Sequence, residues 1–330
     1  MVRTWVASRL IGRFVVGVVT LGLLIGLVVP PAAVAEERPE PAIRARSAIV
    51  VDAESGAVLF ERNARTPYAP ASLTKMVTAL VAVERAPLDR VVRATKAYDV
   101  VPVVIGLEPG DTLTLEDALY GLMLSSGNDA ALAIAETAAD GSSERFVGWM
   151  NDLARRLGLP HARFKNPHGL DQDGHVASAY DMAIIGRALM RQPTLSRIVG
   201  QGRHVVEGPP RWVFRSTNPL LGAYDGVDGI KTGFDDNAGR CLIVTAERDG
   251  RRAIAVVMNS PATGDEAAAL LDYAFSDGGW GSGDAQERPT QSSGDRVAML
   301  RADLAGDGAP GTIAQAGQLV AASSRQAVTR

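Results

Sequence analysis

Three short segments of this chain carry side chains whose types and spacing fit nucleophilic catalysis. The first is Ser72-Leu73-Thr74-Lys75, at the start of a predicted helix. Residues three apart on a helix share a face, so the lysine amine lies beside the serine hydroxyl. A neutral lysine can take the serine proton and make the oxygen a nucleophile, whereas an arginine guanidinium stays protonated in proteins. The helix N-terminus adds backbone N–H groups and a positive dipole end for a developing oxyanion.

The same residues also fit a purely structural role, with Ser72 as the helix N-cap and Lys75 as a solvated first-turn residue. About 0.2 chance matches to this pattern are expected in such a composition, so the motif alone decides little. Lysine is rare in the chain, however, and arginine takes most cationic positions. The 34 basic residues include only four lysines, which are Lys75, Lys96, Lys165 and Lys231.

A second motif, Ser126-Gly127-Asn128, lies in a break between two helical patterns. A second hydroxyl beside a serine–lysine pair can relay a proton to a leaving group, and the asparagine amide can hold a substrate carbonyl. The alternative is that Ser126 only caps the next helix, because Asp129 follows it at capping-box spacing. The two roles are compatible in one side chain.

The third motif, Lys231-Thr232-Gly233, follows the turn at 225–229 and precedes the last predicted hairpin. A lysine and a threonine hydroxyl side by side bind a carboxylate by charge and by a short hydrogen bond. The glycine leaves room for a peptide to lie along the strand edge. The alternative is an ordinary surface turn, but only ~0.02 chance matches to the Lys-Thr-Gly pattern are expected in a chain of this composition. All three motifs together arise by chance at a rate on the order of one in a thousand, which favours a catalytic site.

The elements that position these motifs are predicted from hydrophobic periodicity and turn signals. Apolar runs at 48–51 and 58–60 flank the turn 54–56, and predict a β-hairpin. A second hairpin is predicted at 242–246 and 253–258. Strands at both ends with helices between them favour an α+β fold whose terminal strands meet in one antiparallel sheet. The first predicted helix begins at Ser72, and the second runs from the Thr114–Asp117 capping box through Leu124. Four more helices are predicted at 128–139, 143–157, 180–190 and 265–275.

The two ends of the chain differ from its middle. Residues 1–35 combine an arginine-rich start with an apolar run at 14–29, a proline pair and a small-residue cleavage site at 33–35. This pattern indicates a cleaved signal peptide, with an uncleaved N-terminal anchor as the alternative. In both cases the rest of the chain is exported. Residues 36–275 form the predicted catalytic domain, and the polar, low-complexity composition of 276–330 predicts a disordered tail.

Composition narrows the classes of function. The chain has 46% hydrophobic and 22% charged residues with a net charge of −3, as in a globular protein without the basic excess of nucleic-acid binders. The single cysteine, Cys241, cannot form an internal disulfide or a thiolate zinc site, and is predicted to be a buried apolar residue. The four histidines lack the spacing of a metal site. We therefore predict no metal, no cofactor and no nucleic-acid partner.

Taken together, the motifs resemble the signature of penicillin-binding proteins and class A β-lactamases. The sequence is similar to the serine D-alanyl-D-alanine carboxypeptidases, the low-molecular-weight penicillin-binding proteins, over roughly residues 40–275. This resemblance implies a β-lactamase-like α+β fold, with an antiparallel sheet flanked by helices and an all-helical subdomain. The blocks that carry the resemblance are 70–76 (PASLTKM), 126–130 (SGNDA), 166–170 (NPHGL) and 226–233 (GVDGIKTG).

The resemblance also implies catalytic roles. Ser72 is the nucleophile that becomes acylated, and Lys75 is its base. Ser126 and Asn128 serve in proton relay and substrate holding. The oxyanion hole consists of the N–H groups of Ser72 and Phe234. The implied partners are peptidoglycan stem peptides that end in D-Ala-D-Ala, with β-lactam antibiotics as covalent inhibitors.

Lys231 and Thr232 are implied to bind the terminal D-alanine carboxylate, beside Gly233. The electrostatics expected of two neighbouring lysines fit these two roles, Lys75 as the base and Lys231 as the carboxylate-binding cation. Two buried amines in one site repel each other, so Lys75 is pushed toward its neutral form while Lys231 meets an anion. Family members commonly carry a second β-rich domain and an amphipathic C-terminal anchor, and residues 276–330 show the pattern of neither.

Other functions fit part of this pattern. A class A β-lactamase needs a deacylating glutamate in an E-x-x-L-N-like loop, and Glu136 and Glu144 lack that context. Gly127 also stands where the lactamase motif has aspartate. An endopeptidase that cuts peptidoglycan crosslinks shares all three motifs. A non-hydrolytic β-lactam sensor, or a wall-binding domain, is the alternative from outside the enzymes.

Overall fold

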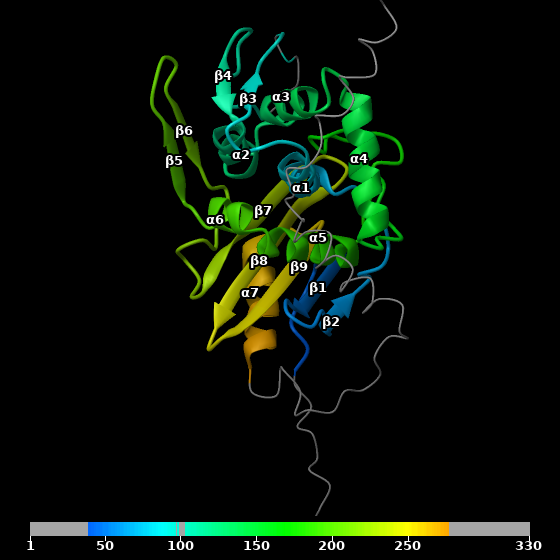
Figure 1. Ribbon diagram of the computed structural model, residues 1–330. Coiled ribbons are helices and arrows are strands. Elements are labelled where there is room, and N and C mark those ends of the chain that lie inside the picture. Colours follow the sequence, from blue (N-terminus) through cyan, green and yellow to red (C-terminus); the bar gives the residue numbers. More distant parts are fainter. Residues whose placement is uncertain (1–38, 97, 99–102, 277–330) are drawn as a thin grey trace, which may run out of the picture. The chain divides into compact units, whose positions relative to one another are not determined.

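The computed structural model describes residues 39–96, 98 and 103–276 of the 330-residue chain. The predicted signal peptide or anchor at 1–35 lies outside the described residues, as does the predicted tail apart from Ser276. The described residues from Glu40 onward belong to one compact unit. Figure 1 shows the helices and strands of that unit.

A five-stranded antiparallel sheet forms the framework, with the strand order β2-β1-β9-β8-β7. Strand β1 from the start of the domain pairs with β9 from its end, which places Ile49 opposite Val256. The β1–β9 pairing confirms the predicted α+β architecture, and the antiparallel β1–β2 and β8–β9 pairs confirm both predicted hairpins. The strands are β1 (Ser47–Asp52), β2 (Val58–Arg62), β7 (Val227–Asp235), β8 (Gly239–Arg248) and β9 (Arg251–Met258).

Alternate residues of the sheet face two separate hydrophobic cores, because successive side chains of a strand point to opposite faces. Val50 and Val244 pack on the side covered by helix α7 (Thr263–Phe275). Ile49 and Ile243 pack on the other side, which helix α5 (Ala179–Arg191) and the remaining helices cover (Figure 1). The chain thus forms a sheet between two layers of helices.

The helical region above the sheet contains the predicted helices and some elements that the sequence did not predict. Helix α1 lies at its centre, with Met76, Val77 and Leu80 fully buried. The Thr114 side chain accepts a hydrogen bond from the N–H of Asp117, as the capping pattern predicted. The helices are α1 (Lys75–Arg85), α2 (Leu115–Met123), α3 (Asn128–Ala138), α4 (Ser143–Arg156) and α6 (Pro193–Val199). Two small hairpins, β3 (Val91–Arg93) with β4 (Thr112–Thr114) and β5 (Arg203–Val206) with β6 (Trp212–Arg215), and helix α6 were not predicted.

The predicted start of the first helix requires a correction. The segment Ala71–Thr74 forms a 3₁₀ turn, η1, and the α-helix begins only at Lys75. The tighter turn begins with Ala71 itself, which has a φ of 47°, in the left-handed region. Ser72 is therefore not the N-cap of a long helix, and Lys75 is a buried residue instead of a solvated one.

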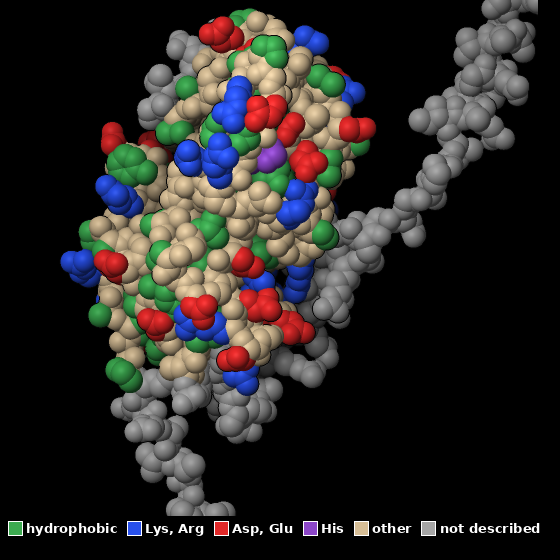
Figure 2. Space-filling view, turned by 90° about the vertical axis from the view of Figure 1, so that its left-hand side faces the viewer, with side chains coloured by type: hydrophobic (Ala, Val, Ile, Leu, Met, Phe, Trp, Pro, Cys, Tyr) green, Lys and Arg blue, Asp and Glu red, His purple; other side chains and the backbone are tan. Residues whose placement is uncertain are grey.

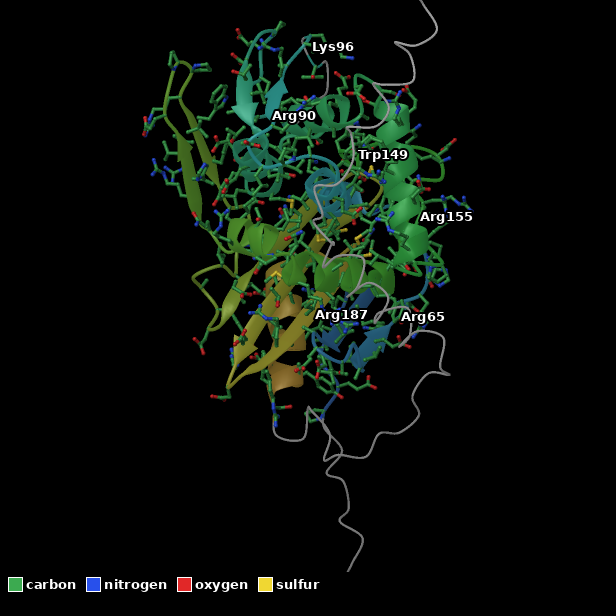
Figure 3. All side chains as sticks on the ribbon, in the orientation of Figure 1. Arg65, Arg90, Lys96, Trp149, Arg155 and Arg187 are labelled. Carbon is green, nitrogen blue, oxygen red and sulfur yellow. The ribbon has the colours of Figure 1, made fainter. Side chains whose placement is uncertain are left out.

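Side chains on the surface tie the layers together. Arg187 of α5 donates hydrogen bonds from Nε to the carbonyl of Ala53 and from a guanidinium N–H to that of Glu54, which anchors the β1–β2 turn (Figure 3). On the face that carries β5 and β6, acidic and basic side chains are interspersed (Figure 2). No helix among the described residues is long and apolar enough to cross a bilayer.

Candidate active site

Ser72 and Lys75 meet at the junction of η1 and α1, on the side of the sheet edge formed by β7. The Lys75 amine lies 2.8 Å from Ser72 Oγ, 2.6 Å from Asn128 Oδ1 and 2.6 Å from the backbone oxygen of His168. The Lys75 side chain is fully buried. The first and second motifs are therefore joined by one amine.

Burial makes the charged form of Lys75 costly. Burial first, and then repulsion from Lys231, lower the pKa of Lys75 well below its usual range, while the Asp129 carboxylate acts in the opposite direction. This direction agrees with the sequence-based expectation that Lys75 is pushed toward its neutral form.

In the neutral form that its lowered pKa favours, the Lys75 amine has two N–H donors and one lone pair. Asn128 Oδ1 and the His168 carbonyl can only accept, so they take the two donors. The lone pair is then left for the O–H of Ser72, which can donate. In that form Lys75 lies within hydrogen-bond distance of the hydroxyl whose proton it would remove.

The second motif lies at the start of α3. Ser126 is 8% exposed and has a φ of 62°, in the left-handed region. The alternative that Ser126 caps α3 is wrong, because the N-cap residue is Gly127 and the cap position makes no side-chain hydrogen bond. The turn at Ser126 places this residue before the cap position. The helix therefore does not use the Ser126 hydroxyl.

The third motif lies on β7, beside the turn that carries the nucleophile. A β-carbon on Gly233 would stand 3.3 Å from the backbone N of Ser72 and from the carbonyl oxygen of Pro70. Only a residue without a side chain allows this close approach without displacement of its neighbours. Phe234 is 63% exposed next to this contact. The two residues whose N–H groups are expected to form the oxyanion hole, Ser72 and Phe234, thus belong to two adjacent segments, η1 and β7.

Lys231 is also buried, but its amine has different hydrogen-bond partners from that of Lys75. The Lys231 side chain is 1% exposed, and its amine donates to the backbone oxygen of Thr232 at 2.9 Å. Burial lowers the pKa of Lys231 to about 7. The Thr232 hydroxyl lies 2.6 Å from that of Thr217. A buried amine beside a hydroxyl is a suitable receptor for a carboxylate, which would restore the ammonium charge.

The loop at 166–170 completes the site, a role that its residue types alone do not indicate. Asn166 Oδ1 accepts from the N–H of Gly169 at 2.7 Å, and the Thr78 hydroxyl donates to the Pro167 carbonyl at 2.6 Å. These bonds hold the His168 carbonyl toward Lys75. The imidazole of His168 is neutral, because its burial, and second the repulsion that a protonated Lys75 would exert, lower its pKa to about 3.

A buried histidine, His175, supports the η1 turn that carries Ser72. His175 Nδ1 accepts from the N–H of Lys165, so Nε2 carries the proton and donates to Thr74 Oγ1 at 2.8 Å. The sequence block 166–170 marked this region only through family resemblance. Sequence spacing could not reveal that a backbone carbonyl and a histidine further along the chain support the site.

The described residues hold no group of three or more histidine, cysteine or acidic side chains that could bind a metal ion. Cys241 is buried on β8, and burial raises the pKa of its thiol to about 12. The thiol is therefore unreactive, as the sequence suggested for a buried apolar residue.

Comparison with known proteins gives consistent matches. A family model described as D-alanyl-D-alanine carboxypeptidase matches residues 33–262. The D-alanyl-D-alanine carboxypeptidase DacF of Bacillus subtilis (strain 168) is 36% identical over 285 residues, covering 82% of this chain and 71% of DacF. DacA of Escherichia coli (strain K12) is 38% identical over 239 residues, covering 66% of this chain and 57% of DacA. This chain thus spans little more than half of DacA.

The fold also matches solved structures. The D-alanyl-D-alanine carboxypeptidase structure from Mycobacterium tuberculosis H37Rv superposes with a TM-score of 0.69 at 32% sequence identity. The match covers 73% of this chain and 94% of the other. The α+β fold that the resemblance implied is therefore confirmed, with an antiparallel sheet flanked by helices.

Proposed function

The chain belongs to the D-alanyl-D-alanine carboxypeptidase family, and on that premise we propose that it removes the terminal D-alanine from peptidoglycan stem peptides through an acyl-enzyme on Ser72. The observation that carries this proposal is the contact of the buried Lys75 amine with Ser72 Oγ at 2.8 Å. A hydroxyl paired with a base that burial keeps neutral is an activated nucleophile.

In the proposed acylation, Lys75 takes the proton of Ser72 as Oγ attacks the carbonyl carbon of the penultimate D-alanine. The N–H groups of Ser72 and Phe234 stabilise the oxyanion. Collapse of the tetrahedral intermediate breaks the peptide bond, and the leaving nitrogen receives a proton through Ser126. Free D-alanine departs and leaves an ester on Ser72, which water then hydrolyses. Asn128 holds the substrate carbonyl through the amide nitrogen that Lys75 does not contact.

Lys231 and Thr232 bind the carboxylate of the terminal D-alanine in this proposal. The substrate thus brings the anion that the buried amine lacks. Gly233 lets the peptide lie along β7 close to Ser72. β-Lactam antibiotics carry a comparable carboxylate and a strained amide, so they acylate Ser72 as substrate mimics.

The proposed site of action is the cell envelope. The signal pattern in residues 1–35 supports export, with anchoring through the same residues as the alternative. The proposed catalytic domain is 36–275, and we assign no catalytic role to the polar segment 276–330.

The test is incubation of the exported chain with a diacyl-L-Lys-D-Ala-D-Ala peptide, with release of free D-alanine as the readout. We expect D-alanine from the wild type and none from Ser72→Ala. An unchanged peptide together with a stable penicillin adduct would identify a sensor instead. Cleavage confined to a crosslinked dimeric peptide would identify an endopeptidase.

A pH dependence follows from Lys231, whose pKa is lowered to about 7 by burial. Because the protonated amine binds the carboxylate, kcat/KM is expected to fall as the pH rises through about 7. The bound carboxylate raises this pKa, so kcat should hold to a higher pH than kcat/KM. In Lys231→Arg the guanidinium stays protonated, and the alkaline fall in kcat/KM should disappear. An alkaline limb that persists in this variant would contradict the assignment.

A further inference from the structure

A buried carboxylate, that of Asp129, directly follows Asn128, the residue whose side chain contacts the catalytic amine. The side chain is 2% exposed, and both of its oxygens accept backbone N–H groups. Oδ1 accepts from Ala130, both oxygens accept from Ile105, and Oδ2 accepts from Gly106 and Leu107, at 2.9 to 3.1 Å. Both oxygens thus accept from backbone N–H donors, which suits a group that acts as an acceptor.

These bonds connect a loop to the residue that holds Lys75. Asn128, the neighbour of Asp129, donates its N–H to the Val103 carbonyl at 2.7 Å and accepts from Lys75 through Oδ1 at 2.6 Å. A β-carbon on Gly127 would stand only 2.8 Å from Ile105, so this loop packs directly on the second motif. The loop 103–107, Asn128 and the amine of Lys75 form one hydrogen-bonded unit around Asp129.

We propose that Asp129 is a positioning residue that acts through Lys75 and Asn128: its carboxylate fixes the loop 103–107 on the second motif, and its buried charge tunes the catalytic amine. This inference rests on the proposed role of Lys75 as the base. Asp129 does not touch the reacting atoms. None of the roles that the family resemblance implied for the three motifs includes this carboxylate.

The charged and titratable groups that face Lys75 come from three elements. Lys231 on β7 disfavours the ammonium form of Lys75, and Asp129 on α3 favours it. His168 on the 166–170 loop is the third, and it is neutral because its pKa is about 3. Asp129 is thus the acidic group that opposes burial and Lys231. Without it the Lys75 pKa would fall further, so the amine would lose its proton at a lower pH.

Asp129→Asn is the test, because it removes the charge and keeps the size of the side chain. The readout is the rate constant for acylation by a fluorescent penicillin, measured across pH. We expect the acid limb of this profile to move to lower pH by about one unit, and the plateau rate to fall as the loop loosens. If Asp129 only held the loop 103–107 in place, Asp129→Asn would lower the plateau rate without moving the acid limb.

Glu136→Gln is the matched control, on the same helix. Glu136 forms an ion pair with Lys96 at 2.9 Å and accepts a hydrogen bond from the Tyr98 hydroxyl, so it binds residues that precede the loop 103–107. It is not among the charges that shift Lys75. We therefore expect its acid limb to match that of the wild type. Equal limb shifts in Asp129→Asn and Glu136→Gln would overturn the proposal, as would an unmoved limb in Asp129→Asn.

Asp129→Glu separates charge from geometry and also serves if Asp129→Asn fails to fold. It keeps the charge and displaces the loop, so its plateau should fall while its acid limb stays near that of the wild type. A limb lowered by about one unit in Asp129→Glu would overturn the proposal. A wild-type protein that penicillin does not acylate at any pH would instead contradict the proposed function, which this profile reports separately.

Discussion

Arginine in place of Lys75 is expected to lower the rate constant for penicillin acylation by about a thousandfold, although the positive charge is kept. The guanidinium cannot give up its proton, so it cannot act as the base for Ser72. It also cannot offer a lone pair to the serine hydroxyl in the way that the contacts of the buried amine allow. The measurement is single-turnover acylation, with thermal melting to verify that the variant is folded.

Lys231→Arg is the matched comparison, because it makes the same change at the other buried lysine. Here a cation that meets a carboxylate is still present, so the loss should be smaller and should appear mostly in KM for the peptide substrate. Equal losses of kcat in the two variants would mean that the roles of the two lysines are wrongly assigned.

Gly169→Ala is expected to reduce acylation by about a hundredfold, because it displaces the turn that carries the nucleophile. Gly169 has a φ of +92°, and a β-carbon there would overlap the carbonyl oxygen of Ala71 and stand 2.9 Å from Thr74 Oγ1. Both atoms belong to the η1 turn, which holds Ser72. The acylation rate constant and the melting temperature should both fall.

Gly141→Ala controls for backbone strain alone. Gly141 has a φ of +89°, nearly that of Gly169, and an added β-carbon would meet no atom within 4 Å. Both variants therefore carry the same conformational cost, and only Gly169→Ala pushes on the site. Gly141→Ala should melt at a lower temperature and acylate at the wild-type rate. Similar acylation rates in the two variants would contradict the idea that the 166–170 loop sets the position of Ser72.

Much of the fold could be predicted from local sequence signals. The continuous apolar runs at 48–51 and 253–258 correctly predicted strands, because both faces of this sheet are buried, each in its own core. The Thr114 cap was also correct, since both of its partners lie within one turn. The small hairpins of β3 with β4 and of β5 with β6 were missed, because strands of three and four residues are too short for periodicity to register.

The site was predictable where chemistry resides in a residue type, and unpredictable where it resides in the backbone. Ser72, Lys75 and Asn128 were singled out by type and spacing, and the structure brings them into direct contact. The His168 carbonyl could not be found in this way, because every residue has one. The prediction that Ser126 caps α3 was wrong. Its expected partner, Asp129, instead bonds to a loop more than twenty residues earlier in the chain, and no local sequence pattern encodes such a contact.

The most direct test of the central claim is to locate the covalent adduct that penicillin forms. Intact-mass spectrometry after incubation with penicillin should show one added acyl group per chain, and peptide mapping should assign it to Ser72. Ser72→Ala should gain no mass under the same conditions. An adduct on any other residue, or none on a folded wild-type protein, would contradict the account of Ser72 as the nucleophile activated by Lys75.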